Sequence, residues 1–191
     1  MHDRRYHPRR KDNSGAHETE NRTFQASIEH LPAFYELYLQ TAGRNKFLVC
    51  DYEHFHALFS VIEQNNQNTE VVFLLASHNS DLLAGVIMVV SENTALFLFG
   101  ASANNKRNYM ASYAVHWEAI RQARARGCTE YDMGGVSPGA APDHPFYGLY
   151  SFKLGFGGQM IHRSGTWDFP LDKDAYTAFR NAETILCGLG G

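Results

Sequence analysis

A single lysine stands inside an aromatic segment near the C-terminal end of the chain. Residues 149–158 read LYSFKLGFGG and place Lys153 between Phe152 and Phe156. A site that stabilises developing negative charge needs such a cation, and the effect of the cation grows as water is excluded. We therefore interpret Lys153 as a catalytic candidate. The alternative is that Phe152 belongs to the core while the lysine side chain snorkels from a short helix to water.

A second candidate segment lies upstream, where residues 131–135 read YDMGG. The pattern is typical of a strand that runs into a glycine-permitted turn. Asp132 is a candidate general base or orienting residue, although its proximity to Gly134 is equally typical of a residue that caps a turn. Tyr131 and Tyr147 are candidates for lining an acceptor cleft.

Positive charge gathers in a third segment, residues 102–108, which read SANNKRN. Lys106 and Arg107 precede an expected helix, so they favour an anionic ligand such as a diphosphate-bearing acceptor or a tRNA end. The alternative is a solvated charge pair on a loop. No glycine follows Gly100 in this loop, so close approach of the backbone to the pyrophosphate of acetyl-CoA is disfavoured.

Composition limits the possible classes of protein. The chain has 191 residues, 44% of them hydrophobic, and a net charge of −3, so no global positive field recruits nucleic acid. Three distant cysteines, Cys50, Cys128 and Cys187, argue against a disulfide framework and fit a reducing cytoplasm. Ten histidines include no metal-binding motif, so we expect no metal. No apolar run is long enough for a membrane span.

The hydrophobic pattern predicts the elements that hold these residues. We expect a disordered basic and polar tail over residues 1–25 and one domain over 26–191. Predicted helices begin near residue 31 and cover 52–63, 110–126, 146–154 and 173–186. Predicted strands cover 71–77, 82–91, 95–100 and 129–133, with a final strand pair within 159–169. In the helix over 110–126 we expect Tyr113, Trp117 and Ile120 on the apolar face, which Ala114 and Ala123 widen. Within the strands, Gly85 indicates a bulge or a close backbone approach.

This order of elements resembles the GNAT acyltransferase fold. The expected class is α/β (α+β), a mixed and mostly antiparallel sheet with helices on both faces.

The motifs YDMGG and LYSFKLGFGG, with the segment that runs from residue 99 through Arg107 and Tyr113 to Ile120, resemble the FemABX peptidyltransferases. The resemblance implies transfer of an amino acid from aminoacyl-tRNA to an amine of a peptidoglycan precursor, either UDP-MurNAc-pentapeptide or a lipid-linked form, in the cytoplasm and without a cofactor. It implies that Lys153 stabilises the oxyanion and that Phe152 stacks on the terminal adenine of the tRNA. The other implied substrate-binding residues are Arg107, Lys106, Tyr113, Tyr131 and Tyr147.

The resemblance runs from about Phe34 to the end and corresponds to the second of two GNAT-like halves. We expect this half to act as a single-domain variant, as a homodimer or with a partner chain. Two alternatives remain, an acyl-CoA-dependent N-acyltransferase and a non-catalytic half.

Overall fold

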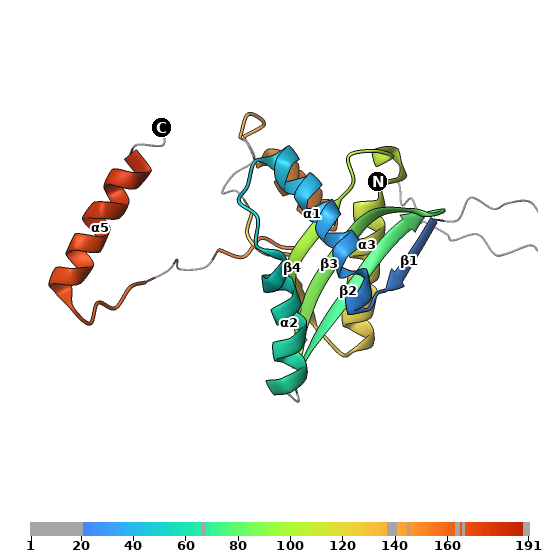
Figure 1. Ribbon diagram of the computed structural model, residues 1–191, viewed down its shortest axis with the longest axis horizontal. Helices are drawn as coiled ribbons and strands as arrows, with labels where there is room; N and C mark the ends of the chain where they lie inside the picture. The colour runs from blue at the N-terminus through green and yellow to red at the C-terminus, as the bar shows by residue number, and fades with distance from the viewer. Residues whose placement is uncertain are drawn as a thin grey trace, which may run out of the picture. The chain divides into compact units, whose positions relative to one another are not determined.

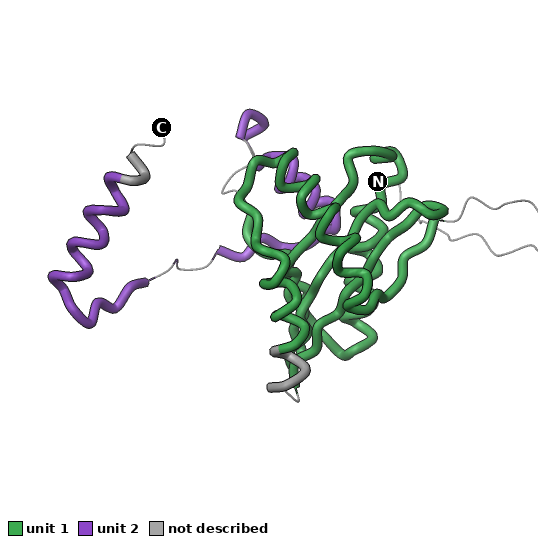
Figure 2. Tube along the Cα trace, in the orientation of Figure 1, with its two compact units in different colours: residues 1–136 green, residues 137–191 purple. Residues whose placement is uncertain are grey.

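The computed structural model describes residues 21–65, 68–136, 141–144, 146–162, 165 and 167–188. The chain divides into two compact units, Met1–Val136 and Ser137–Gly191 (Figure 2). None of the helices within these ranges has the length and apolar character needed to cross a membrane.

Unit 1 contains a five-stranded sheet whose strands follow one another in sequence order (Figure 1). The strands are β1 (Asn21–Gln25), β2 (Thr69–His78), β3 (Asp81–Ser91), β4 (Thr94–Ser102) and β5 (Glu130–Asp132). The first four pair antiparallel, and β5 pairs parallel to β4. The sheet is therefore mixed and mostly antiparallel, as the sequence predicts.

Three helices cover the sheet in unit 1. Helices α1 (Leu31–Asn45) and α2 (Tyr52–Asn65) lie on one face, and α3 (Ala111–Ala125) lies on the other (Figure 1). Short 3-10 turns, η1 (Ile28–His30) and η2 (Arg107–Tyr109), precede α1 and α3. Unit 2 holds α4 (Tyr147–Leu154) and α5 (Lys173–Gly188). The predicted helices over 52–63, 146–154 and 173–186 are all present within two residues of their expected ends.

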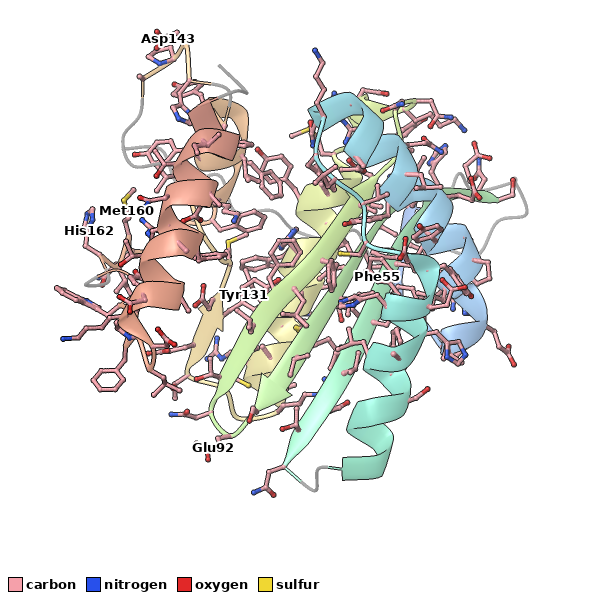
Figure 3. All side chains as sticks on the ribbon, turned by 60° about the vertical axis from the view of Figure 1, so that its left-hand side comes forward. Phe55, Glu92, Tyr131, Asp143, Met160 and His162 are labelled. Carbon is pink, nitrogen blue, oxygen red and sulfur yellow. The ribbon has the colours of Figure 1, made fainter. Side chains whose placement is uncertain are left out.

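Alternate side chains of β2 and β3 enter two separate cores. Phe73 and Ile87 pack with Phe34 and Phe55 under α1 and α2, where Phe55 lies between α2 and the sheet (Figure 3). The intervening residues of the same strands pack under α3. Because both faces are covered, these strands read as nearly unbroken apolar runs. Each large side chain that is fully buried contributes about 1.5–3 kcal/mol.

The sheet side of α3 differs from the expected one. Ala123 faces the sheet as expected, but its neighbours there are Val115 and Ala119, whereas Tyr113 and Trp117 are 37% and 56% exposed. The expectation weighted the largest apolar residues. The small residues, spaced four apart, let the helix lie close to the sheet and so take the buried side.

Two further expectations are corrected. Residues 21–25, assigned to the tail, form β1, because the polar Asn21 hydrogen-bonds the buried His78 and the backbone pairs with β2. Residues 1–20 lie outside the described part. The strand pair expected within 159–169 is wrong for the described residues, none of which is in a strand. Apolar alternation alone does not make a strand, because a strand also needs partners for its backbone groups.

Gly85 on β3 marks a close approach, as expected. A Cβ atom at this position would lie 2.6 Å from Cδ2 of Phe34 and 2.8 Å from Cδ2 of Leu75. Both side chains are fully enclosed in the core, so neither can move aside freely. The register of β2 with β3 also shifts beside this position, between Ala76 and Ser77.

Substitution Gly85→Ala is therefore expected to lower the free energy of unfolding by about 1–3 kcal/mol through overpacking. Gly43 on α1 is the matched control, since nothing lies within 4 Å of a Cβ placed there. Gly43→Ala should raise stability by about 0.5–1 kcal/mol, the usual gain in a helix. Urea unfolding measures both. Equal midpoints for the two variants would contradict the packing argument.

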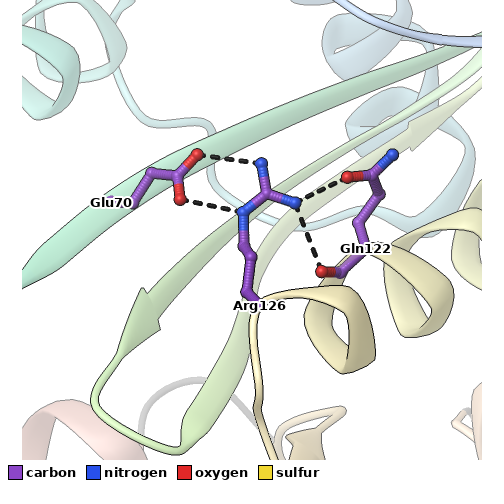
Figure 4. Close-up of polar contacts among 3 residues, drawn as sticks. All are labelled: Glu70, Gln122 and Arg126. Carbon is purple, nitrogen blue, oxygen red and sulfur yellow. Dashed lines mark hydrogen bonds and ion pairs between the residues drawn. The ribbon is translucent and has the colours of Figure 1, made fainter.

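An ion pair fastens the C-terminal end of α3 to β2 (Figure 4). Nε and Nη2 of Arg126 donate to the two carboxylate oxygens of Glu70 at 2.8 and 2.9 Å. Nη1 of the same guanidinium donates to the backbone and side-chain oxygens of Gln122 at 3.2 and 2.5 Å. The hydrogen bond from Arg126 lowers the pKa of the Glu70 carboxyl below its ordinary value.

This lowered pKa predicts how stability depends on pH. The contribution of Glu70 should be complete above its ordinary pKa of 4.5 and should be lost as the pH falls through the lower value of the folded state. The Glu70 side chain is half exposed, so solvent screening limits the contribution to about 1 kcal/mol or less. Glu70→Gln should destabilise at pH 7 and converge with the wild type near pH 3. Glu36→Gln, at an exposed residue of α1 outside this ion pair, is the control and should stay within about 0.5 kcal/mol of wild type at pH 7.

Candidate functional site

The loop after β4 carries positive charge and is held on both sides by neighbouring elements. Ala103 N donates to Leu83 O at 2.9 Å, and Asn104 N donates to Oε1 of Gln40 at 3.3 Å. The loop therefore begins against β3 and α1. No glycine occurs in residues 101–110, so non-glycine residues make the turn into α3.

Lys106 and Arg107 lie in this loop but differ in their partners. Lys106 has left-handed backbone geometry (φ 50°), and its Nζ lies 2.5 Å from Oδ2 of Asp81 in an exposed ion pair. Arg107 begins η2, is exposed, and forms no ion pair with any described residue. Of the two predicted cations, only Lys106 pairs with a carboxylate among the residues that the structure describes.

Tyr113 sits one turn beyond η2, in the first turn of α3. Met110, also left-handed (φ 55°), forms the N-cap, and Tyr113 N donates to Met110 O at 2.9 Å. The tyrosine ring is on the outer side of the helix rather than in the core. The structure thus brings Lys106, Arg107 and Tyr113 together at the start of α3.

Tyr131 on β5 points into the core beneath α3 (Figure 3). A hydrogen bond of 3.1 Å joins its hydroxyl to Nδ1 of His116, a buried residue of α3. The His116 ring also packs edge-on against Phe97, with ring centroids 4.7 Å apart. Burial raises the pKa of the Tyr131 phenol well above its ordinary value, so the hydroxyl stays protonated at neutral pH.

Asp132 follows directly and shapes the turn after β5. Its Oδ1 accepts a hydrogen bond from Gly134 N at 2.7 Å, the turn-capping geometry that the sequence left open as an alternative. Gly134 has a left-handed backbone (φ 73°), which the turn requires.

Within unit 1, strand β4 lies between two groups of candidate residues. One group is Tyr131 with Asp132, and the other is the loop of Lys106 and Arg107. β5 pairs with β4 only from Thr94 to Leu96, and no other described strand continues along that edge. The remaining stretch, Phe97 to Ser102, spans about 20 Å at about 3.3 Å per residue. It contains a bulge at Leu98, since Ile87 pairs with Phe99 and Met88 with Phe97. Tyr131 and Asp132 therefore lie at one end of an open strand edge and Arg107 at the other.

The third group lies on α4 in unit 2. Lys153 falls in the last turn of the helix, where a cation interacts favourably with the helix dipole, and only 9% of the residue is exposed. Phe152 packs edge-on against Phe156, with centroids 5.4 Å apart. Tyr147 stacks near Tyr150 one turn earlier, at 6.4 Å.

The burial of Lys153 argues against the alternative that its side chain snorkels from α4 to water. A lysine that snorkels places its ammonium in water, whereas this side chain is enclosed. Enclosed lysines are uncommon because the charge loses hydration, so they usually serve an interaction that compensates for the loss.

Two residues close to these groups are absent from the sequence-based candidates. His116 is a polar residue on the buried side of α3, so the pattern of apolar residues does not single it out. Arg44 in α1 contacts the loop from a position 58 residues away, which no local pattern indicates. In the described part of the chain, no cluster of three or more His, Cys, Asp or Glu side chains could hold a metal ion.

The model of the FemAB family matches residues 62–184, which is most of the sheet, α3 and both elements of unit 2. The chain belongs to the FemAB family. The resemblance stated from the YDMGG and LYSFKLGFGG motifs is thereby confirmed, and both motifs fall within the matched range.

Curated FemAB relatives share part of their length with this chain. It is 29% identical over 118 residues to a lipid II:glycine glycyltransferase of Staphylococcus saprophyticus, covering 61% of this chain and 28% of that protein. It is 30% identical over 126 residues to the protein of the same name from Staphylococcus haemolyticus, covering 65% and 29%. The matched region is thus less than a third of each relative.

Solved structures establish the fold. FemX superposes with a TM-score of 0.62 at 17% identity, over 71% of this chain and 50% of that one. An aminoglycoside acetyltransferase from an uncultured soil metagenomic sample, solved with sisomicin, gives 0.53 at 16% identity over 80% and 97%. This FemAB chain therefore has the expected GNAT-like acyltransferase fold.

The hydrogen bond between Tyr131 and His116 yields a stability prediction. Tyr131→Phe leaves Nδ1 of a buried histidine without this partner, so the free energy of unfolding should fall by about 1–2 kcal/mol. Tyr109→Phe is the matched control, because no described residue hydrogen-bonds its hydroxyl, and it should stay within about 0.5 kcal/mol of wild type. Thermal unfolding followed by circular dichroism compares them. If both variants lose the same stability, the hydroxyl of Tyr131 has no special structural role.

Proposed function

We propose that this chain carries the reaction centre of a FemABX-type aminoacyltransferase. In this proposal it transfers an amino acid from aminoacyl-tRNA to an amine of a peptidoglycan precursor peptide and so builds a peptide cross-bridge. Family membership and the names of the curated relatives, lipid II:glycine glycyltransferases, support the reaction class. The observation that carries the proposal is the enclosed Lys153 beside the aromatic Phe152 on α4.

Lys153 suits the charge that develops in this reaction. The acceptor amine attacks the ester carbonyl of the aminoacyl-tRNA, and the carbonyl oxygen becomes an oxyanion in a tetrahedral intermediate. The carbonyl then re-forms as the ester C–O bond breaks, the C–N bond remains, and the departing tRNA oxygen takes up the proton lost by the amine to become the free hydroxyl. An ammonium held in a site with little water stabilises the oxyanion by a few kcal/mol, about the effect of an oxyanion-hole donor.

Asp132 is the proposed group for the proton of the attacking amine. One carboxylate oxygen is held by Gly134 N, which fixes the direction of the other. A carboxylate so oriented can accept the amine proton as the C–N bond forms. Tyr113 and Tyr147 are each proposed to contact the acceptor. Tyr131, whose hydroxyl hydrogen-bonds the buried His116, is proposed to support Asp132 from the core.

Arg107, with Lys106 beside it, is proposed to bind the diphosphate of the acceptor. UDP-MurNAc-pentapeptide and the lipid-linked precursor both carry this group, and a guanidinium binds phosphate oxygens in a bidentate manner. Arg107 is available for this role because no described carboxylate pairs with it.

Phe152 is proposed to stack on the terminal adenine of the donor tRNA, an interaction of about 1–3 kcal/mol. The donor supplies an activated ester, so the reaction needs no cofactor. Aminoacyl-tRNA is found in the cytoplasm, and we place the reaction there. Family members unite two GNAT-like halves, so a second copy or a partner chain is proposed to complete the acceptor cleft.

A second candidate, an acyl-CoA-dependent N-acyltransferase, is suggested by the fold shared with acetyltransferases. The glycine-free loop after β4 argues against it, because its Cβ atoms restrict approach of the backbone to a pyrophosphate.

The test offers both donors to the purified chain. UDP-MurNAc-pentapeptide is incubated with an aminoacyl-tRNA pool or with acetyl-CoA, and products are read by mass. We expect an added amino-acid residue, formed at a rate that Lys153→Met lowers about 10²–10³-fold. Lys153→Arg keeps the charge and should retain more activity. Lys173→Gln, an exposed lysine of the same unit, should match the wild type.

The outcomes separate the candidates. An acetyl shift in place of an amino-acid shift would assign the chain to the acyl-CoA-dependent enzymes. Equal rates for Lys153→Met and Lys173→Gln would remove Lys153 from the reaction. No product from either donor would contradict activity of the isolated chain and favour the non-catalytic half.

A further inference from the structure

Arg44 connects the end of α1 to the loop that carries Arg107. Its Nη2 donates to Oγ of Ser102 at 2.8 Å, and its Nη1 donates to the backbone oxygen of Ser102 at 3.2 Å. Nη1 also hydrogen-bonds Oδ1 of Asn104. One guanidinium therefore engages three oxygen atoms of the residues at which β4 ends.

Neighbouring residues of α1 hold the same segment. Oγ1 of Thr41 accepts a hydrogen bond from Ser102 N at 2.9 Å, and Oε1 of Gln40 accepts one from Asn104 N. The last turns of α1 thus fix the backbone of the loop at its first residues. Only Arg44 among these side chains brings a charge.

The other side of the loop is also fastened. Lys106 pairs with Asp81 at the β2–β3 turn, and the ring of Tyr109 stacks on the buried ring of His78, with centroids 4.0 Å apart. Arg107 lies between these fixed points. Its backbone direction is therefore set by contacts on both sides, while its own side chain stays available.

The charges in this region do not balance within the described residues. Neither Arg44 nor Arg107 has a carboxylate partner there. Burial, and next the charge of Arg107, lower the pKa of the Arg44 guanidinium. Two like charges that repel each other, held near one another by the fold, favour an anion supplied by a ligand.

We propose that Arg44 is a positioning residue, which fixes residues 102–104 so that Arg107 presents its guanidinium to a phosphate group of the substrate. This inference rests on the proposed function in one respect, the diphosphate-bearing acceptor. The planar guanidinium of Arg44 can hydrogen-bond three oxygen atoms at once, two of Ser102 and one of Asn104. A lysine keeps the charge but cannot make the same set of directed bonds.

The test uses inorganic pyrophosphate as the probe and the full chain, with arginine side chains labelled for nuclear magnetic resonance. Titration follows the Nε resonance of Arg107. Arg44→Lys should weaken pyrophosphate binding about tenfold although the net charge is unchanged. Arg124→Gln is the control, since it removes a charge from an exposed arginine of α3 outside this region, and it should change the affinity less than about twofold.

Ser102→Ala provides a second variant if Arg44→Lys does not fold. It removes one acceptor of Arg44 and leaves both charges in place, so binding should weaken by a smaller factor, about two- to threefold. Amide hydrogen exchange of residues 103–109 should become faster in both variants. Such loosening, with a displaced Arg107 resonance, is the signature of a positioning role.

Wild-type affinity in Arg44→Lys would overturn the proposal, as would a wild-type chain that binds no pyrophosphate. A loss in Arg44→Gln that Arg44→Lys fully restores would also overturn it, because charge alone would then suffice. The transfer assay is independent of this titration. Pyrophosphate binding that depends on Arg44, in a chain that transfers no amino acid, would support the positioning role while contradicting the proposed reaction.

Discussion

Burial of both faces of β2 and β3 is the constraint on which the rest of the structure depends. Because alternate side chains of these strands enter different cores, α1 and α2 must cover one face and α3 the other. This arrangement fixes where β4 ends and where α3 begins. The loop of Lys106 and Arg107 lies between those points, so its place follows from the packing of residues that have no part in the chemistry.

The sequence predicts much of this architecture for a physical reason. Apolar runs on strands covered from both sides are long and unbroken, so β2, β3 and β4 are readily recognised. β1 escapes recognition because Phe24 is its one large apolar residue, and its pairing depends on a neighbour far along the chain. The sheet side of α3 is misassigned because small residues, whose apolar signal is weak, allow the close approach that large ones prevent.

The sequence predicts those site residues that lie in short motifs, and it misses those that act through contacts between distant segments. Lys153, Asp132 and Arg107 each lie in a short segment of distinctive composition, so sequence alone singles them out. Arg44 and His116 matter through contacts with Ser102 and Tyr131, and those contacts exist only after the chain has folded. The residues found from motifs are the ones proposed to contact substrate, whereas Arg44 and His116 hold such residues in place.

The loop after β4 has a thermodynamic consequence that follows from its lack of glycine. Lys106 and Met110 adopt left-handed backbone conformations that L-residues enter at a cost of about 1 kcal/mol or more each. The fold supports that cost together with the loss of backbone freedom, so both are incurred before any ligand arrives. Binding then requires little further ordering of the chain, and affinity depends on the contacts themselves. A glycine-rich loop distributes these costs differently, because it stays freer when empty and loses more entropy when occupied.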